Sequence, residues 1–277
     1  MRARNGHKGV ACVMACAAIG AAAASARGVV VVGGEPAPQP AVSYVGLWNG
    51  ATGVAIGSNW IISARHVGGQ PGSVFVLGDQ AYTADLVIGH PTEDVLLARL
   101  TEPLPGHHRL APLAAAGQEV LLAGMGYRAG ESLGNGWAWS ASGLAWGSNR
   151  LDGVGARMLI TFDEPASAAA TVNESIFTML DSGGGVFVDG PSGPELAGIA
   201  VSVTGVFGSS LYGARSFAVN LEPLRAWILH HVAPGEPIAS SIGPTRAPSI
   251  PAGPAVPGPA SVVLSVAAGL WSLRRRR

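Results

Sequence analysis

Three polar residues in this 277-residue sequence have the types that nucleophilic acyl transfer by a serine requires. His66 follows an apolar run, Asp94 precedes another, and Ser182 opens a turn of three glycines. A serine hydroxyl is a weak nucleophile and needs a base within hydrogen-bond reach, a task that imidazole performs near neutral pH. A carboxylate can hold the imidazole in the required tautomer and stabilise its cation. A fold that brought His66, Asp94 and Ser182 together would therefore contain the groups for this chemistry.

The segments that must position these residues have the pattern of short β-strands. Between residues 31 and 220, apolar runs alternate with clusters of Gly, Ser, Asn and Asp, and helical periodicity is scarce. Many short strands at this spacing are typical of an antiparallel sandwich or barrel. The expected strands are 42–48, 53–56, 60–63, 73–76, 84–88, 95–100, 120–123, 158–162, 186–188, 196–203 and 216–219.

One segment departs from the strand pattern. Four apolar residues fall at helical spacing between residues 221 and 232. Asn220 could cap this helix, and Pro223 suits its first turn. We therefore expect an all-β body that is followed by a single helix.

Charge is sparse and unevenly distributed. Only 12% of residues are charged, and apolar residues make up 48%, which excludes disorder as the dominant state. Residues 31–233 contain eight arginines, no lysine and sixteen acidic residues, a formal net charge of −8. Nucleic-acid binding needs a basic footprint, so an acidic body argues against a nucleic-acid partner.

Both cysteines, Cys12 and Cys16, lie near the start of the chain. Disulfides, zinc–thiolate sites, iron–sulfur clusters and cysteine nucleophiles are therefore excluded from the body. The histidines offer no better ligand set, because four of the seven stand in adjacent pairs that make poor joint ligands. We expect neither a metal nor a cofactor.

Several motifs, taken in order, resemble those of a known family. The segment Ser-Ala-Arg-His-Val around His66 is similar to Thr-Ala-Ala-His-Cys, and Asp-Val-Leu-Leu-Ala-Arg-Leu from Asp94 is similar to Asp-Ile-Ala-Leu-Leu-Lys-Leu. Asp-Ser-Gly-Gly-Gly around Ser182 resembles Gly-Asp-Ser-Gly-Gly-Pro, and the segments at 31–34, 196–199 and 227–228 also match. These are signatures of the trypsin-like, chymotrypsin-fold serine proteases, and the resemblance spans about residues 31–232.

The resemblance implies two six-stranded antiparallel β-barrels with the active site between them and one C-terminal helix. It places a protease domain at 31–233, with barrel one at about 31–112, barrel two at about 113–220 and the helix at 221–232. In this family the residue matching His66 is the general base, that matching Asp94 orients it, and that matching Ser182 is the nucleophile.

Further site residues carry over by resemblance. The backbone N–H groups of Leu180 and Ser182 would form the oxyanion hole, although the family has glycine where this chain has Leu180. A new amino terminus at Val31 would pair with Asp181. If so, residues 27–30 would be a short propeptide, because Ala24-Ser25-Ala26 is a small-x-small cleavage site.

Alignment with the family also predicts the substrate pocket. Ile176 falls at the base of the primary pocket, and Val201, Ser202 and Val203 fall along its edge. None of these offers a negative charge for Arg or Lys, so we expect a preference for apolar residues of modest size. Glu174 is the nearby carboxylate that could overturn this expectation.

The two ends of the chain have the composition of sorting signals. Residues 1–26 begin with Arg2, Arg4 and Lys8, continue in an apolar run, and are typical of a secretory signal peptide. A Pro-rich linker follows the body at 234–255, and the segment 256–277 ends in an apolar stretch and four arginines. This tail resembles a PEP-CTERM sorting signal, which exosortase-type enzymes process in Gram-negative bacteria; a plain membrane anchor is the alternative.

Both interpretations of the tail place the body outside the cytoplasm, in the periplasm or at the cell surface, with transient or permanent membrane anchoring through the C-terminus. We expect a secreted serine endopeptidase that acts on a protein or peptide. The alternative is a catalytically weak surface protein that uses the protease fold for binding, a reading motivated by Leu180.

Overall fold

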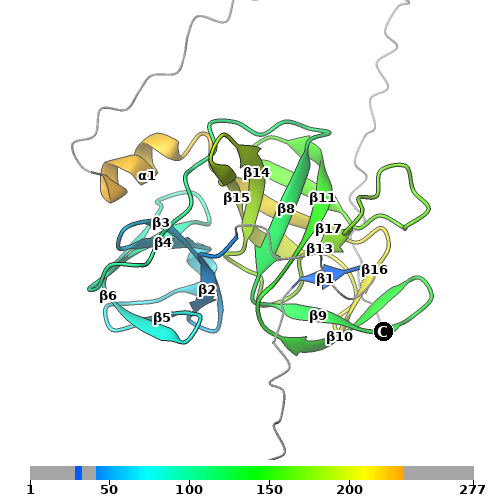
Figure 1. Ribbon diagram of the computed structural model, residues 1–277, viewed down its shortest axis with the longest axis horizontal. Coiled ribbons are helices and arrows are strands. Elements are labelled where there is room, and N and C mark those ends of the chain that lie inside the picture. Colours follow the sequence, from blue (N-terminus) through cyan, green and yellow to red (C-terminus); the bar gives the residue numbers. More distant parts are fainter. Residues whose placement is uncertain (1–28, 33–41, 234–277) are drawn as a thin grey trace, which may run out of the picture. The chain divides into compact units, whose positions relative to one another are not determined.

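The computed structural model describes residues 29–32 and 42–233 (Figure 1). The predicted signal peptide, Pro-rich linker and sorting tail lie outside the described residues. Strands dominate the described part, and its one α-helix, α1, spans Arg225–Val232. Within these residues no helix is long and apolar enough to cross a membrane.

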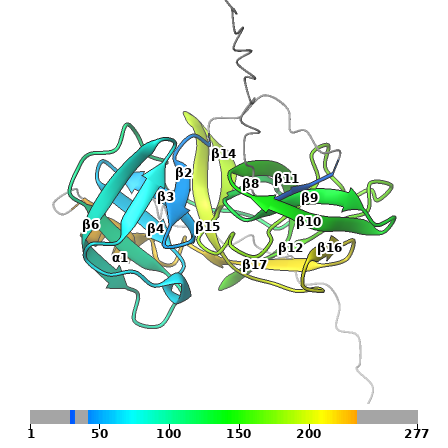
Figure 2. The same cartoon turned by 90° about the horizontal axis from the view of Figure 1, so that it is seen from below.

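The first half of the described chain forms a closed six-stranded antiparallel barrel, drawn in blue and cyan in Figures 1 and 2. The strands pair in the order β2-β3-β4-β7-β6-β5, and pairing of β2 with β5 closes the barrel. A short 3-10 helix, Arg65–Val67, directly follows β4. The strands are β2 (Val45–Trp48), β3 (Ala51–Gly57), β4 (Trp60–Ser63), β5 (Val74–Leu77), β6 (Gln80–Gly89) and β7 (Leu96–Leu100).

The second half forms another closed barrel of six antiparallel strands, in the order β11-β12-β17-β15-β14-β8. It lies beside the first barrel in both views (Figures 1 and 2). Its strands are β8 (Glu119–Gly124), β11 (Ala145–Val154), β12 (Arg157–Thr161), β14 (Gly185–Gly190), β15 (Gly193–Val203) and β17 (Arg215–Asn220).

Two small sheets accompany the second barrel. A two-stranded sheet pairs β1 (Val30–Val31) with β13 (Ser175–Ile176), and a three-stranded sheet has the order β16-β10-β9. The members of the second sheet are β9 (Tyr127–Ser132), β10 (Gly136–Ser142) and β16 (Ser209–Leu211). The segment at residues 30–31 therefore pairs with a strand next to barrel two, whereas we expected barrel one to begin at about residue 31.

The strands of barrel one bury side chains on both faces. In β3, Ala55 packs in a cluster confined to barrel one, whereas its neighbours Val54 and Ile56 pack in a cluster that also includes Phe187 of barrel two and Ile228 of α1. Successive side chains of a strand point to opposite faces, so one face fills barrel one and the other joins the two barrels. This shared core holds the two halves of the site in a fixed relation.

The predicted fold class, two six-stranded antiparallel barrels and one C-terminal helix, is confirmed. The helix begins four residues later than expected, at Arg225 rather than Leu221. Asn220 does accept a hydrogen bond from the N–H of Glu222, at 3.1 Å, but this bond closes a turn before the helix. Leu224 occupies the N-cap position and supplies no side-chain cap.

Candidate active site

The structure brings together the three residues that the sequence singles out. Nε2 of His66 lies 2.8 Å from Oγ of Ser182, and Nδ1 of His66 lies 2.7 Å from Oδ2 of Asp94. The backbone N–H of His66 donates to the other oxygen, Oδ1, at 2.9 Å. His66 and Asp94 come from barrel one, and Ser182 comes from the turn that leads into β14 of barrel two.

The contacts of Asp94 determine the tautomer of the imidazole. A carboxylate accepts hydrogen bonds, so the Nδ1 atom of His66 must carry the proton that points at Oδ2. Nε2 then presents a lone pair to the hydroxyl of Ser182. The arrangement is that of a base ready to take the serine proton, and the imidazole is 46% exposed, so a substrate can reach it.

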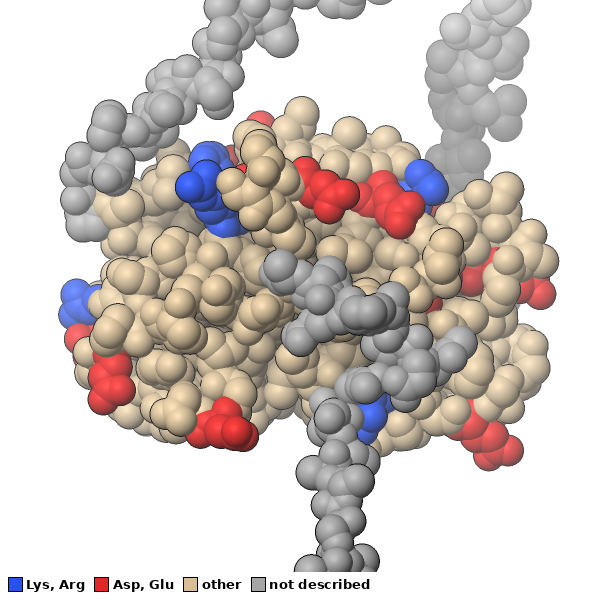
Figure 3. Space-filling view, in the orientation of Figure 1, with Lys and Arg blue, Asp and Glu red and all other residues tan. Residues whose placement is uncertain are grey.

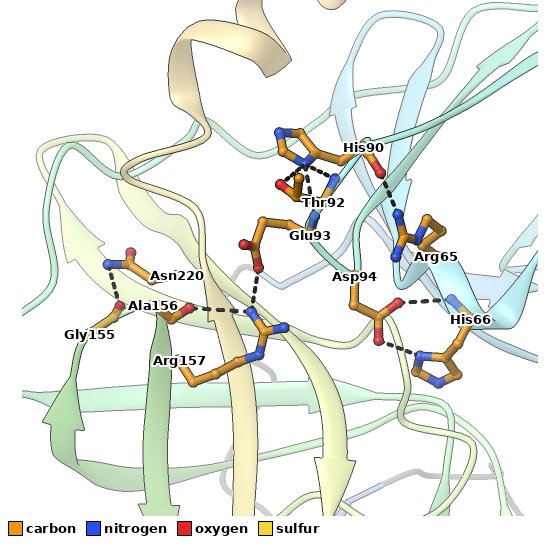
Figure 4. Close-up of polar contacts among 10 residues, drawn as sticks. All are labelled: Arg65, His66, His90, Thr92, Glu93, Asp94, Gly155, Ala156, Arg157 and Asn220. Carbon is orange, nitrogen blue, oxygen red and sulfur yellow. Dashed lines mark hydrogen bonds and ion pairs between the residues drawn. The ribbon is translucent and has the colours of Figure 1, made fainter.

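A network of hydrogen bonds shapes the loop before Asp94 (Figure 4). Nδ1 of His90 accepts from the backbone N–H groups of Thr92, at 3.3 Å, and Glu93, at 3.0 Å. Nη1 of Arg65, the residue before His66, donates to the carbonyl of His90 at 2.6 Å. The segments that carry His66 and Asp94 are therefore linked outside the active site itself.

The second barrel also contacts this loop. Nη1 of Arg157, at the start of β12, lies 2.7 Å from Oε2 of Glu93 (Figure 4). Glu93 directly precedes Asp94 in the chain, so this ion pair joins the barrel that carries Asp94 to the barrel that carries Ser182. The side chains of Glu93 and Arg157 are both partly exposed to solvent, so this ion pair contributes modestly to stability.

The turn that presents Ser182 depends on a glycine. Gly183 has φ +88°, a conformation that residues with a Cβ rarely adopt, and a Cβ there would collide with the backbone oxygen of Thr52. The N–H of Gly183 donates to the carbonyl of Ala200 at 2.8 Å, and Thr52 donates its own N–H to the carbonyl of Ser182 at 2.9 Å. The segment that carries Ser182 is thus held from both barrels.

The two expected oxyanion donors are unpaired. Over residues 29–32 and 42–233, neither the N–H of Leu180 nor that of Ser182 donates to a protein acceptor. Leu180 adopts φ +70°, in the left-handed region that costs a residue with a Cβ about 1–2 kcal/mol. The backbone therefore takes the conformation that glycine would adopt without strain, although leucine occupies the position.

Asp181 is fully buried, and its carboxylate accepts hydrogen bonds from the N–H of Gly126 and from the N–H and hydroxyl of Thr178. The backbone N–H of Val29 also interacts favourably with this carboxylate. Burial raises the pKa of this carboxyl to about 7, although its hydrogen bonds act in the opposite direction. No positive charge is among the described partners of Asp181.

The backbone N–H of Val29 interacts with the carboxylate of Asp181, whereas the sequence resemblance implies Val31 as the partner of Asp181. Val31 lies in β1, where it pairs with Ser175, and Val30 pairs with Ile176. Val29 is 1% exposed. With β1 paired in this register, the residue near Asp181 is Val29, two positions before the residue that the family alignment predicts.

A pocket of about 460 Å³ opens beside the three residues. Two of its walls come from the segment 177–182 and from the end of β15, and its lining includes Val201, Ser202 and Val203. Ile176 is not part of this lining, because it pairs with Val30 and packs into the core of barrel two. Phe177, the next residue, is part of the lining, although it is 1% exposed and packs in the same core cluster.

Glu174 does not face the pocket either. Its carboxylate accepts hydrogen bonds from the amide of Asn149, at 2.8 Å, and from the N–H groups of Asp163 and Thr171. Burial raises the pKa of Glu174 to about 7. The carboxylate organises the loop 163–171 and offers no charge to a substrate in the pocket.

Charged side chains are few on the face that Figure 3 shows. They lie singly or in small groups among wide uncharged areas, and no basic residues gather into a patch there. This distribution fits a body with sixteen acidic residues and eight arginines, and it offers no footprint for a phosphate backbone on that face.

No protein-family model matches this sequence, and no curated protein is significantly similar to it. Among solved structures, the chain is similar to "neuropsin, a serine protease expressed in the limbic system of mouse brain", with a TM-score of 0.51 and 17% sequence identity. The match covers 69% of this chain and 95% of that chain. The fold is the chymotrypsin fold. At this identity the likeness concerns the fold alone.

Sequence reasoning missed two residues of the site. Thr52 contacts the segment 180–182 from barrel one, and nothing in the sequence around Thr52 distinguishes it from an ordinary strand residue. Val29 is the first of four consecutive valines. The motif match that selects Val31 depends on the two glycines after the run, and nothing in the sequence distinguishes Val29.

Proposed function

We propose that this protein is an extracytoplasmic serine endopeptidase that hydrolyses peptide bonds through an acyl-enzyme. The observation that carries the proposal is the hydrogen-bonded series Asp94–His66–Ser182 at the mouth of a 460 Å³ pocket. A fluorophosphonate probe tests it, because the probe reacts only with an activated serine. Labelling of the wild type but not of Ser182→Ala is the expected result.

In the proposed reaction, Nε2 of His66 takes the proton of Ser182 as Oγ forms a bond to the peptide carbonyl carbon. The carbonyl oxygen becomes an oxyanion that accepts hydrogen bonds from the N–H groups of Leu180 and Ser182. The C–N bond then breaks, and the imidazolium gives its proton to the leaving amine. A water molecule, deprotonated by His66, then attacks the acyl carbon. The bond from that carbon to Oγ breaks, the carboxylic acid leaves, and the imidazolium returns the proton to Ser182.

The pocket supports a preference for apolar residues of modest size. Its lining includes the apolar residues Phe177, Leu180, Val201 and Val203. Asp181 borders the pocket, but its carboxylate is buried and occupied by hydrogen bonds from Gly126 and Thr178. An Arg or Lys side chain would enter without a partner charge, which is costly in a desolvated site.

For the N-terminus, the contacts of Val29 favour a revised processing site. Cleavage between Gly28 and Val29 would convert the N–H at Asp181 into an ammonium and pair it with the buried carboxylate. Ala26 and Gly28 are small residues at the −3 and −1 positions of that bond, the pattern that leader peptidases accept. A single cut that removes the leader would then also complete the site.

For the C-terminus, the sequence supports the proposal that segment 256–277 is a sorting tail or anchor on the Pro-rich linker 234–255. An exosortase-type enzyme would process the tail in a Gram-negative bacterium, and the body would act in the periplasm or at the cell surface. Deletion of residues 256–277 tests this: the truncated chain should be released as a soluble, folded body, while the full chain stays with the membrane fraction.

The second candidate function is that of a binding protein with a catalytically weak site. The observation in its favour is Leu180, whose left-handed backbone carries a strain that glycine would avoid. The fluorophosphonate probe separates the two candidates, because a binding protein has no need of an activated Ser182.

A further inference from the structure

Thr52, in β3 of barrel one, is fully buried and hydrogen-bonded through its N–H, its C=O and its hydroxyl. The backbone N–H donates to the carbonyl of Ser182 at 2.9 Å, and the backbone carbonyl accepts from the hydroxyl of Ser63 at 2.6 Å. The hydroxyl donates to the carbonyl of Leu180 at 3.0 Å and accepts from the N–H of Met125 at 2.9 Å. Thr52 therefore touches both residues whose N–H groups form the proposed oxyanion hole.

The direction of these bonds is determined by their partners. The backbone N–H of Met125 can only donate, so it occupies a lone pair of the threonine oxygen. The single hydroxyl proton of Thr52 then remains for the carbonyl of Leu180, which can only accept. Because Thr52 is fully buried, this bond is hard to replace, since a buried polar group without a partner is costly.

The carbonyl that Thr52 holds belongs to the strained residue of the loop. Leu180 has φ +70°. A strained backbone conformation of this kind persists only where contacts with the surrounding structure hold it in place. In the part of the chain that the structure describes, the hydroxyl of Thr52 is the one hydrogen-bond donor to that carbonyl. Its loss would leave Leu180 free to relax to negative φ, which would rotate its N–H away from the hole.

We propose that Thr52 is a positioning residue: its hydroxyl holds Leu180 in the left-handed conformation and so keeps the oxyanion hole formed. The inference rests on the proposed protease function. It explains how a leucine can occupy a position where glycine would be free of strain, since a side chain from the other barrel supplies the restraint. It also makes the hole dependent on the contact between the two barrels.

Thr52→Val tests the inference, because it keeps the shape of the side chain and removes the hydroxyl. One oxyanion donor is typically worth 10²- to 10³-fold in kcat, so we expect kcat on a peptide substrate to fall by about 10- to 100-fold. KM should change less than about twofold, since the oxyanion hole acts in the transition state and Thr52 itself does not line the pocket. Thr52→Ser, which keeps the hydroxyl, should stay within about threefold of the wild type. Thr52→Ala serves in its place if Thr52→Val does not fold.

A role in stability alone would give a different pattern. Thr101→Val is the matched control, because the hydroxyl of Thr101 also donates to a backbone carbonyl of barrel one, that of Thr83, outside the pocket lining. This control should leave kcat unchanged. In a Leu180→Gly background, Thr52→Val should lower kcat by less than about threefold, because glycine needs no restraint to adopt positive φ.

Three results would overturn the inference. One is a Thr52→Val enzyme with the kcat of the wild type, and another is a Thr52→Ser enzyme as impaired as Thr52→Val. The third is an equal loss from Thr52→Val in the Leu180→Gly background. Each of these leaves the proposed function standing. A wild type that neither cleaves peptides nor reacts with the fluorophosphonate overturns the proposed function, and this inference with it.

Discussion

Nε2 of His66 lies 2.8 Å from Oγ of Ser182, although 116 positions of the chain separate the two residues and they belong to different barrels. The distance therefore depends on how the barrels pack. The shared cluster around Val54, Phe187 and Ile228 and the bonds from Thr52 to the segment 180–182 maintain that packing. Changes at either contact should affect the reaction as well as stability.

The orienting role of Asp94 gives the first prediction. Asp94→Asn removes the charge, and an amide that donates to Nδ1 would favour the wrong tautomer of His66. We expect kcat to fall on the order of 10⁴-fold with little change in KM. Steady-state kinetics on a peptide substrate measure both, and Asp85→Asn, which disrupts an exposed ion pair with Arg99, is the control. An Asp94→Asn enzyme within tenfold of the wild type would contradict this role.

Leu180→Gly measures whether the oxyanion hole is already formed. Among the described residues the N–H groups of Leu180 and Ser182 have no acceptor, and Thr52 is hydrogen-bonded to the carbonyl of Leu180, so glycine should add little. We expect kcat to change less than about tenfold, which corresponds to about 1.4 kcal/mol. A rise of about 100-fold or more would show instead that leucine keeps one donor out of place.

The N-terminus should alter how stability depends on pH. In the uncut chain, burial raises the folded-state pKa of Asp181 to about 7 from an ordinary value of 3.8. Between about pH 4 and pH 7 the folded chain then holds a proton that the unfolded chain has lost, so this group's contribution to stability falls as pH rises. An ammonium at Val29 would lower the pKa of Asp181 and remove that loss.

Urea unfolding at pH 4.5 and pH 7.5 checks this, with a chain that begins at Val29 and one that retains residues 27–28. Both should carry Ser182→Ala, to prevent self-cleavage. Glu174, whose pKa burial also raises, and His108, whose pKa burial lowers, are common to both chains and cancel in the comparison. The longer chain should lose more stability between the two pH values. N-terminal sequencing of the secreted protein should begin at Val29; a start at Val31 would refute the revised site.

Substrate preference follows from the pocket lining. Peptide libraries should be cut after apolar residues of modest size, because Phe177, Val201 and Val203 line the pocket and Glu174 is directed elsewhere. Profiling the cleaved bonds by mass spectrometry measures the preference. Dominant cleavage after Arg or Lys would show that the carboxylate of Asp181 or Glu174 reaches the substrate.

The fold and the three polar residues were predictable because they depend on local patterns. His66, Asp94 and Ser182 each adjoin an apolar strand or a glycine turn, and their order along the chain matches a known family. Short strands between turn residues also predict a sandwich or barrel, even when the pairing of the strands is not known. The helix was expected too early because apolar spacing alone continued through Leu221 and Leu224, whereas the structure forms a turn there.

Other features depend on register and on contacts between distant segments. The choice between Val29 and Val31 rests on how β1 pairs with β13, and a run of identical valines carries no such information. Alignment along the chain predicts Ile176 at the base of the pocket, but Ile176 pairs with Val30 and packs in the core. Thr52 acts on Leu180 across 128 positions of the chain, which no local pattern could indicate.

Labelling by a fluorophosphonate probe tests the central claim most directly, because it requires an activated Ser182 and no knowledge of the substrate. The chain that begins at Val29 should be labelled stoichiometrically at Ser182, as a peptide map would show. Ser182→Ala should not react, and His66→Ala should react at a background rate, since the two residues act as a unit. Failure of the folded wild type to react, with Val29 as its free N-terminus, would contradict the account.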